Sequence, residues 1–121
     1  MHAIAQTHAF TRAAAEAGMT GDEIDSLIDF VADNPTAGDE MQGTGGCRKL
    51  RFAAPGRGKR GSYRVITFFT GGNLPVFLIA VFKKGERANL SKAECNSLAK
   101  LTKAIAAEYR AKVVKAARKG A

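Results

Sequence analysis

Three strand-like segments follow one another in the middle of the chain, and they limit the possible folds more than any other feature. They cover residues 47–54, 63–70 and 74–82. Gly-rich connections join them, including Gly71-Gly72-Asn73, which has the composition of a hairpin turn. The sequence therefore predicts a three-strand antiparallel meander.

The two faces of the predicted sheet differ in character. In the first strand, the two-residue period places Leu50 and Phe52 on one face and Lys49 and Arg51 on the other. Residues 76–82 are apolar without alternation, as expected of an interior strand covered on both faces. The first strand should therefore bury one face and display cations on the other.

Two helices are predicted before the sheet. Thr7 should cap a helix that Gly18 stops. Thr20 and Glu23 form a capping-box pattern, and apolar residues at 24, 27, 28 and 31 give the second helix one apolar face. Asn34-Pro35 should end this second helix.

The rest of the chain completes an α+β pattern. Residues 2–6 are a candidate edge strand, and residues 36–46 are predicted to be loop. Ser91 and Glu94 form another capping box, which opens a C-terminal helix. We expect one domain over residues 1–121 with a small antiparallel sheet, two N-terminal helices and one C-terminal helix.

Charge is divided unevenly along this chain of net charge +8. Residues 1–46 carry a net charge of −7 and residues 47–121 a net charge of +15, and residues 48–64 alone contain seven Lys or Arg and no acid. A cationic surface fixed on a sheet favours a polyanionic ligand, with RNA as the leading candidate. A solvated basic surface without a ligand is the alternative.

No segment predicts export or membrane insertion. The first ten residues lack a basic region followed by an apolar run, and the longest apolar run is only as long as a strand. Cys47 and Cys95 fit neither a metal-ligand spacing nor a disulfide framework. A cytoplasmic protein with two free thiols and no membrane contact is expected.

The sequence gives little support for a nucleotide-binding motif or a metal site. Residues 56–61 satisfy G-x-G-x-x-G, but a strand follows where a dinucleotide site needs a helix. The predicted sheet contains no acidic residue, and the acids at 22, 25, 29 and 33 form the polar face of one helix rather than a magnesium site. We therefore expect no metal and no cofactor.

Cations alone can cleave RNA, because the neighbouring 2′-hydroxyl can attack the phosphate. Arg suits the stabilisation of a doubly charged phosphorane. Lys can act as a base where burial and nearby cations favour its neutral form. Lys49, Lys83 and Lys84 have cationic neighbours in the sequence, although phosphate contacts without catalysis remain the alternative.

Four segments of the chain resemble RelE/HigB-like toxins. Residues 43–53 read GTGGCRKLRFA, residues 58–66 read GKRGSYRVI, residues 83–91 read KKGERANLS, and residues 34–39 read NPTAGD. The resemblance implies an α+β fold similar to microbial ribonucleases and cleavage of mRNA on the ribosome. It also implies a helix-turn-helix (HigA-like) antitoxin that neutralises the toxin.

The resemblance assigns catalytic roles position by position. The paired basic positions of the first core strand fall on Lys49 and Arg51, and the arginine of the next strand falls on Arg64. The last cationic position falls on Lys83 or Lys84. Lys49 is the expected base, with Lys84 as the alternative, while Arg51 and Arg64 would stabilise the phosphorane.

Other expected contacts involve an aromatic residue and further cations. Leu90 stands near the place where RelE has a tyrosine, so stacking would fall to Phe82 or Tyr63. The residues expected to hold RNA are Arg48, Arg57, Lys59, Arg60, Lys83 and Arg87.

Two other functions fit a chain of this kind. One is a non-enzymatic toxin of the same fold that inhibits a protein such as gyrase, and the cationic strand face argues against it. The other is a plain RNA-binding module, for which interleaved aromatic residues are lacking. The free toxin is expected to be monomeric.

Overall fold

The structure is a computed structural model that describes residues 2–53, 62–71, 74–83 and 90–119. Its elements follow the order β1, α1, α2, β2, β3, β4, β5, α3. The strands are β1 (Ile4–Gln6), β2 (Asp39–Glu40), β3 (Cys47–Ala53), β4 (Ser62–Phe68) and β5 (Val76–Lys83), and the helices are α1 (His8–Glu16), α2 (Gly21–Asp33) and α3 (Lys92–Lys119).

The five strands form one sheet in the order β1-β5-β4-β3-β2. The expected antiparallel meander of β3, β4 and β5 is confirmed, and the candidate edge strand is present as β1. However, β1 runs parallel to β5, so the sheet is mixed, and the expectation of an antiparallel sheet holds for the meander but not for this edge strand. The parallel pairing covers the outer edge of β5, whose Val76 amide donates to the Ala3 carbonyl at 2.9 Å.

A second difference lies at the opposite edge of the sheet. Residues 36–46 were predicted to be loop, yet Asp39 and Glu40 form the two-residue strand β2 against β3. The statement that the sheet contains no acidic residue was therefore also wrong. A short, charged edge strand of this kind protects the sheet from pairing with another chain, and the sequence gives no periodic signal for two residues.

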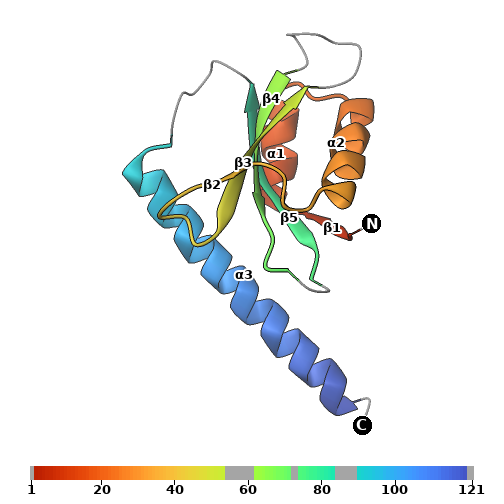
Figure 1. The fold of residues 1–121 in the computed structure, drawn as a ribbon, viewed down its shortest axis with the longest axis vertical. Helices are drawn as coiled ribbons and strands as arrows, with labels where there is room; N and C mark the ends of the chain where they lie inside the picture. Colours follow the sequence, from red (N-terminus) through yellow and green to blue (C-terminus); the bar gives the residue numbers. More distant parts are fainter. Residues whose placement is uncertain (1, 54–61, 72–73, 84–89, 120–121) are drawn as a thin grey trace.

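The sheet is covered by helices on both faces (Figure 1). α1 and α2 pack on one face over a core that includes Phe10, Leu27, Val31, Val65 and Leu78. The other face has a smaller core, in which α3 contributes the partly buried Leu98 and Ile105. Beyond this contact, α3 extends well past the rest of the molecule (Figure 1).

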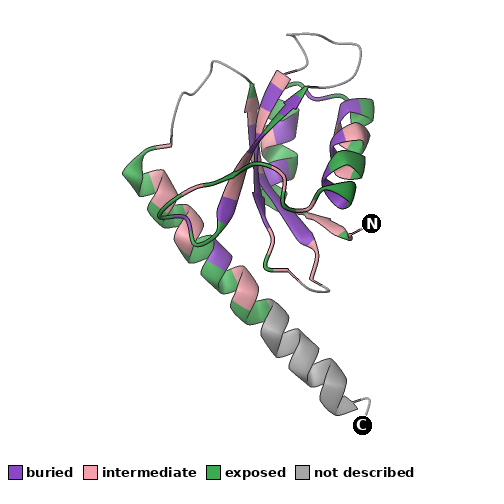
Figure 2. Cartoon of the chain, in the orientation of Figure 1, coloured by how far each residue is buried: buried purple, intermediate pink, exposed green. Residues whose placement is uncertain are grey.

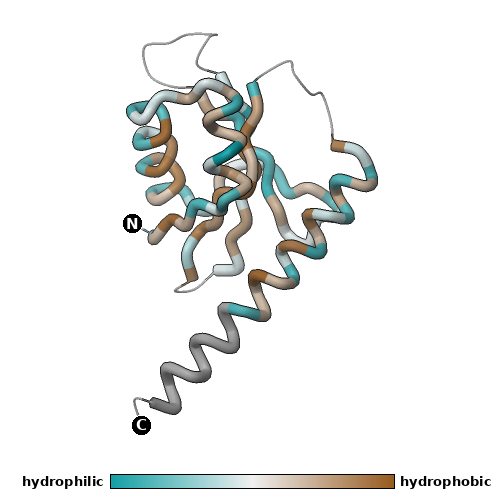
Figure 3. The backbone as a smooth tube through the Cα atoms, turned by 180° about the vertical axis from the view of Figure 1, so that it is seen from behind, coloured by the Kyte–Doolittle hydropathy of each residue, from teal (hydrophilic) through white to brown (hydrophobic). Residues whose placement is uncertain are grey.

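Burial and hydropathy follow the same two layers. Buried residues gather in the strands and on the inner sides of α1 and α2, whereas most described residues of α3 are exposed or half-buried (Figure 2). Polar and apolar residues alternate along the two N-terminal helices (Figure 3). This is expected of helices that bury only one side.

The predicted helix starts are confirmed in atomic detail. The Thr7 hydroxyl accepts from the Phe10 amide at 3.1 Å. At the start of α2, the Thr20 amide donates to Glu23 Oε1 at 2.9 Å and the Glu23 amide donates to Thr20 Oγ1 at 3.1 Å. Ser91 and Glu94 make the same reciprocal pair, at 3.0 and 3.1 Å. These bonds satisfy backbone donors that a helix leaves unpaired at its first turn.

Candidate nucleic-acid interface and active site

Arg51 and Arg64 are the centre of the candidate site. They are direct partners in the antiparallel pairing of β3 with β4. Direct partners point to the same face, with Cβ atoms about 4.5–5.5 Å apart. Two cations in this position repel each other, and sheets normally avoid such pairs.

Lys49 completes a triangle of cations on this face. It lies two residues before Arg51 on β3, about 7 Å away along the strand. Its partner on β4 is Ile66, a residue of the core beneath α3. The residues on either side of Arg51 and Arg64 along their strands belong to the core beneath α1 and α2. The three cations therefore lie on the other face of the sheet, the one on which α3 packs. We call Lys49, Arg51 and Arg64 the cationic row.

No side chain of the cationic row forms an ion pair in the part of the chain that the structure describes, although Asp39 of β2 is the direct strand partner of Lys49. The single ion pair in that part joins Arg48 to Glu40 at 3.3 Å. Arg64 and Lys49 are half-buried and Arg51 is exposed. Among the described residues, Arg51 and Arg64 therefore have no carboxylate as a direct strand partner, and an anion from another molecule can bind them.

Arg48 and Lys83 are not brought together with the cationic row. Arg48 occupies the other face of β3 by the strand period, and its guanidinium also donates to the Gly38 carbonyl at 3.1 Å. Lys83 is opposite Tyr63, so it points to the side of α1 and α2. The expected contacts Lys84, Arg57, Lys59, Arg60 and Arg87 lie outside the described residues.

The two candidate stacking residues have different environments. Tyr63 is 1% exposed, and its hydroxyl donates to Glu23 Oε2 at 3.1 Å, so its ring is a core element. Phe82 is half-buried and directly opposite Arg64, on the face of the cationic row. Phe82 is thus the aromatic side chain placed beside these cations.

The Tyr63–Glu23 bond is a feature that sequence reasoning missed. The capping box identified Glu23 as a helix-start residue, but it gave no indication that the same carboxylate is 4% exposed and reaches β4. Tyr63 immediately precedes Arg64. The bond therefore ties α2 to the back of the strand that carries one of the cations.

The loop before β3 connects the sheet to α3. Buried Thr102 of α3 donates from its hydroxyl to the Thr44 carbonyl at 3.1 Å. Gly45 has φ +77°, and a Cβ atom added there would overlap the Thr102 side chain. The Thr44 hydroxyl in turn accepts from the Cys47 amide at 3.1 Å. Close contact between loop and helix therefore requires glycine at position 45.

Cys47 is a structural thiol. It is fully buried at the start of β3, and this burial raises the pKa of the Cys47 thiol to about 11. It is a free thiol, as is Cys95 on α3. A thiol that remains protonated at neutral pH is a poor nucleophile, so Cys47 is not suited to catalysis.

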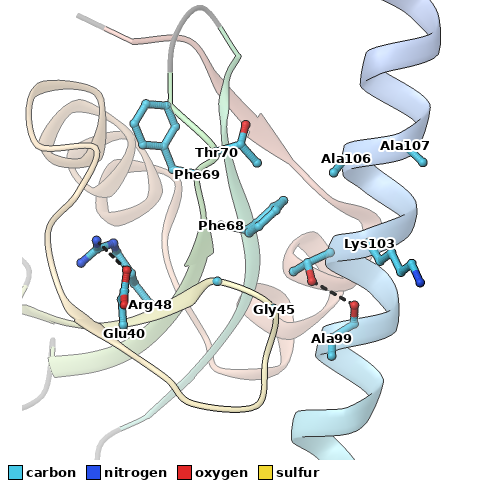
Figure 4. A pocket seen from close by; sticks show the side chains of 12 residues that line it. Glu40, Gly45, Arg48, Phe68, Phe69, Thr70, Ala99, Lys103, Ala106 and Ala107 are labelled. Atoms are coloured by element: carbon cyan, nitrogen blue, oxygen red, sulfur yellow. Dashed lines mark hydrogen bonds and ion pairs between the residues drawn. The ribbon is translucent and has the colours of Figure 1, made fainter.

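Two grooves lie between α3 and the sheet. The larger has a volume of about 740 Å³ and lies where α3 leaves the sheet. Figure 4 shows Phe68 lying toward α3 in this groove, with the Arg48–Glu40 pair away from the helix. The smaller, of about 370 Å³, lies between β5 and the N-terminal half of α3 and includes Phe82 and Ile66. Neither groove is lined by a residue of the cationic row, whereas a separate hollow of about 170 Å³ at the ends of β3 and β4 is lined by Arg51 and Arg64.

The described residues contain neither a metal-binding cluster nor a membrane-spanning helix. No group of three or more His, Cys, Asp or Glu side chains within them is placed to hold a metal ion. No helix among them combines the length and apolar character that crossing a membrane requires.

The fold and the cationic row define a small α+β protein with a sheet face suited to a polyanion. The family model described as the RelE toxin of the RelE/RelB toxin–antitoxin system matches residues 2–121. The chain therefore belongs to the RelE toxin family and is the toxin of a toxin–antitoxin pair, with an antitoxin as its partner. One similar solved structure is the free E. coli toxin RelE carrying two arginine-to-alanine substitutions, with a TM-score of 0.48 and 18% identity over 81% of this chain and 93% of that chain.

Proposed function

We propose that this toxin is an mRNA endoribonuclease that acts on the ribosome and needs no metal ion for the cut. RelE family members are endoribonucleases, and the chain belongs to that family. The observation that carries the proposal is the cationic row, in which Arg51 and Arg64 are direct partners without a carboxylate partner among the described residues. A protein tolerates such repulsion where a polyanion relieves it.

The proposed reaction is a transesterification within the RNA. The 2′-oxygen attacks the adjacent phosphorus, a phosphorane forms, and the bond from phosphorus to the 5′-oxygen breaks. The products are a 2′,3′-cyclic phosphate and a 5′-hydroxyl. Lys49 in its neutral form takes the proton of the 2′-hydroxyl, and a general acid returns a proton to the departing 5′-oxygen. Lys84 is the alternative base.

Arg51 and Arg64 bear the charge of the phosphorane in this scheme. Arginine offers two parallel N–H donors to two phosphate oxygens, and it keeps its charge throughout the reaction. The half-buried position of Arg64 favours it for this role, because electrostatic contacts strengthen as water is excluded. The remaining cations, among them Arg57, Lys59 and Arg60, hold mRNA or ribosomal RNA.

The partner in this proposal is a helix-turn-helix antitoxin of the HigA type. The free toxin is a monomer and works in the cytoplasm, where it meets translating ribosomes. Neutralisation then requires the antitoxin to cover the cationic row or to prevent entry into the ribosome.

Replacement of Arg64 by alanine tests the proposal. We expect single-turnover cleavage on saturated ribosome–mRNA complexes to fall about a hundred- to a thousandfold, as when one transition-state donor is lost, while ribosome binding changes little. Arg12→Ala, an exposed arginine on α1, is the control for loss of one charge. Fragment ends should carry 5′-hydroxyls.

Three results would contradict the proposal. Fragments with 5′-phosphates would indicate attack by water and a different mechanism. Normal cleavage by Arg64→Ala would remove Arg64 from catalysis. Growth arrest without any mRNA cleavage would instead favour a toxin that inhibits a protein target.

A further inference from the structure

The hollow of about 170 Å³ at the ends of β3 and β4 contains a polar residue that has no role in the proposed chemistry, Ser62. The hollow is lined by Arg51, Phe52, Ala53, Ser62 and Arg64. Resting on the proposed function, we infer that the Ser62 hydroxyl is a third hydrogen-bond donor to the cleaved phosphate, beside the two guanidinium groups. It binds one particular non-bridging oxygen of that phosphate.

The strand register places Ser62 on the same face as the two arginines. Ser62 is two residues before Arg64 on β4, and its direct partner on β3 is Ala53, two residues after Arg51. Residues two apart on a strand share a face and lie about 7 Å apart along it. The four residues therefore form two adjacent cross-strand pairs, one of long cations and one of small side chains.

The pair of small side chains accounts for the hollow. Ala53 and Ser62 leave space above the backbone of the two strands, and the longer side chains of Arg51 and Arg64 border that space. Phe52 belongs to the core beneath α1 and α2, so its ring lies on the opposite face. A phosphate that contacts both arginines from this hollow lies next to the Ser62 hydroxyl.

The polar side chains that line the hollow can all donate hydrogen bonds, and none of them is acidic. Ser62 is half-buried, and its hydroxyl forms no hydrogen bond to another of the described residues. A guanidinium group donates only, and a serine hydroxyl can donate one hydrogen bond. A neutral donor thus adds a contact to the charge that develops on the phosphorane, without adding to the repulsion between Arg51 and Arg64.

The test uses ribosome complexes with mRNA that carries a single phosphorothioate at the phosphate that the intact toxin cleaves. Sulfur replaces either the pro-R or the pro-S non-bridging oxygen, and it accepts hydrogen bonds only weakly. Single-turnover rates are measured on both diastereomers and on unmodified mRNA, for the intact toxin and for Ser62→Ala. Cleavage of unmodified mRNA by the intact toxin checks the proposed function separately.

We expect Ser62→Ala to cleave unmodified mRNA about 10- to 150-fold more slowly than the intact toxin, the range for a lost hydrogen bond to a charged group. On one diastereomer this ratio of rates should fall close to one, because sulfur has already weakened the contact that the substitution removes. On the other diastereomer the ratio should remain. A serine that only supported the strand would give the same ratio on all three substrates.

Two variants serve as controls. Ser62→Thr keeps a hydroxyl at the same position and should retain both cleavage and the difference between the diastereomers. Ser26→Ala removes a hydroxyl from a half-buried position of α2, which packs on the other face of the sheet, and should behave like the intact toxin. Thermal unfolding of each variant confirms that it is folded.

Three results would overturn the inference. Normal cleavage of unmodified mRNA by Ser62→Ala would show that the hydroxyl contributes nothing to the reaction. An equal loss on all three substrates would show that Ser62 does not contact a non-bridging oxygen. Absence of cleavage of unmodified mRNA by the intact toxin would overturn the proposed function, and this inference with it.

Discussion

The repulsion between Arg51 and Arg64 should be measurable as a loss of stability. Two unit charges held at the Cβ spacing of direct strand partners, about 5.5 Å, would repel each other by about 0.8 kcal/mol in a water-like dielectric, and this is an upper bound because long guanidinium side chains can lie farther apart. Arg51 is exposed, so its side chain can turn away and relieve part of this repulsion. We expect Arg51→Gln to raise the free energy of unfolding by about 0.5 kcal/mol at low salt, and to abolish cleavage.

The assay is thermal unfolding at two salt concentrations. For a chain of 121 residues, a gain of about 0.5 kcal/mol corresponds to an increase in Tm of about 2 °C. The gain should shrink as salt increases, because the repulsion between the two charges is screened as the Debye length falls from about 30 Å at 0.01 M to about 3 Å at 1 M. Arg12→Gln removes the same net charge from α1 and serves as the control.

Two outcomes would refute this reasoning. If Arg51→Gln were no more stable than Arg12→Gln at low salt, the two guanidinium groups would not be held against each other. If the gain were the same at high salt, its origin would be packing or strand propensity rather than charge. Retained cleavage by Arg51→Gln would exclude Arg51 from the proposed chemistry.

Two further predictions concern the contacts that support the sheet. Tyr63→Phe removes the hydroxyl that donates to buried Glu23. It should lower the free energy of unfolding, measured in urea, by about 1.5–3 kcal/mol, as expected for a hydrogen bond to a charged group. A loss below about 0.5 kcal/mol would contradict this prediction. Gly45→Ala should be more destabilising than Gly43→Ala. Both glycines have φ near +78°, but only a Cβ at position 45 meets Thr102. Equal decreases in Tm for the two variants would show that the contact with α3 contributes nothing to stability.

Much of the fold could be predicted because local signals agreed with each other. The capping boxes marked the starts of α2 and α3, and the alternation of Leu50 and Phe52 with Lys49 and Arg51 gave the correct faces of β3. β1 and β2 were harder, since strands of three and two residues depend on the edge they cover rather than on their own pattern. The parallel direction of β1 depends on pairing with β5, about 70 residues later.

The site could be predicted in part for the same reason. The strand period placed Lys49 and Arg51 together on one face, but only the register shows that Arg64 is opposite Arg51 and that Arg48 turns toward Glu40. Register depends on contacts between strands, which a single sequence does not reveal. Burial of Tyr63 and Glu23 likewise results from the packing of α2 on the sheet.

The cationic row and the Tyr63–Glu23 bond lie back to back on β4. Tyr63 fixes the strand from the side of α2, and the next residue, Arg64, faces the open side, opposite Arg51. A repulsive pair tends to separate its strands, and a buried hydrogen bond to a carboxylate resists that separation where the repulsion acts. Locally unfavourable charge held by favourable packing is typical of functional sites. If the two are coupled in this way, Tyr63→Phe should lose more stability at low salt than at high salt, and the combined variant with Arg51→Gln should lose this dependence.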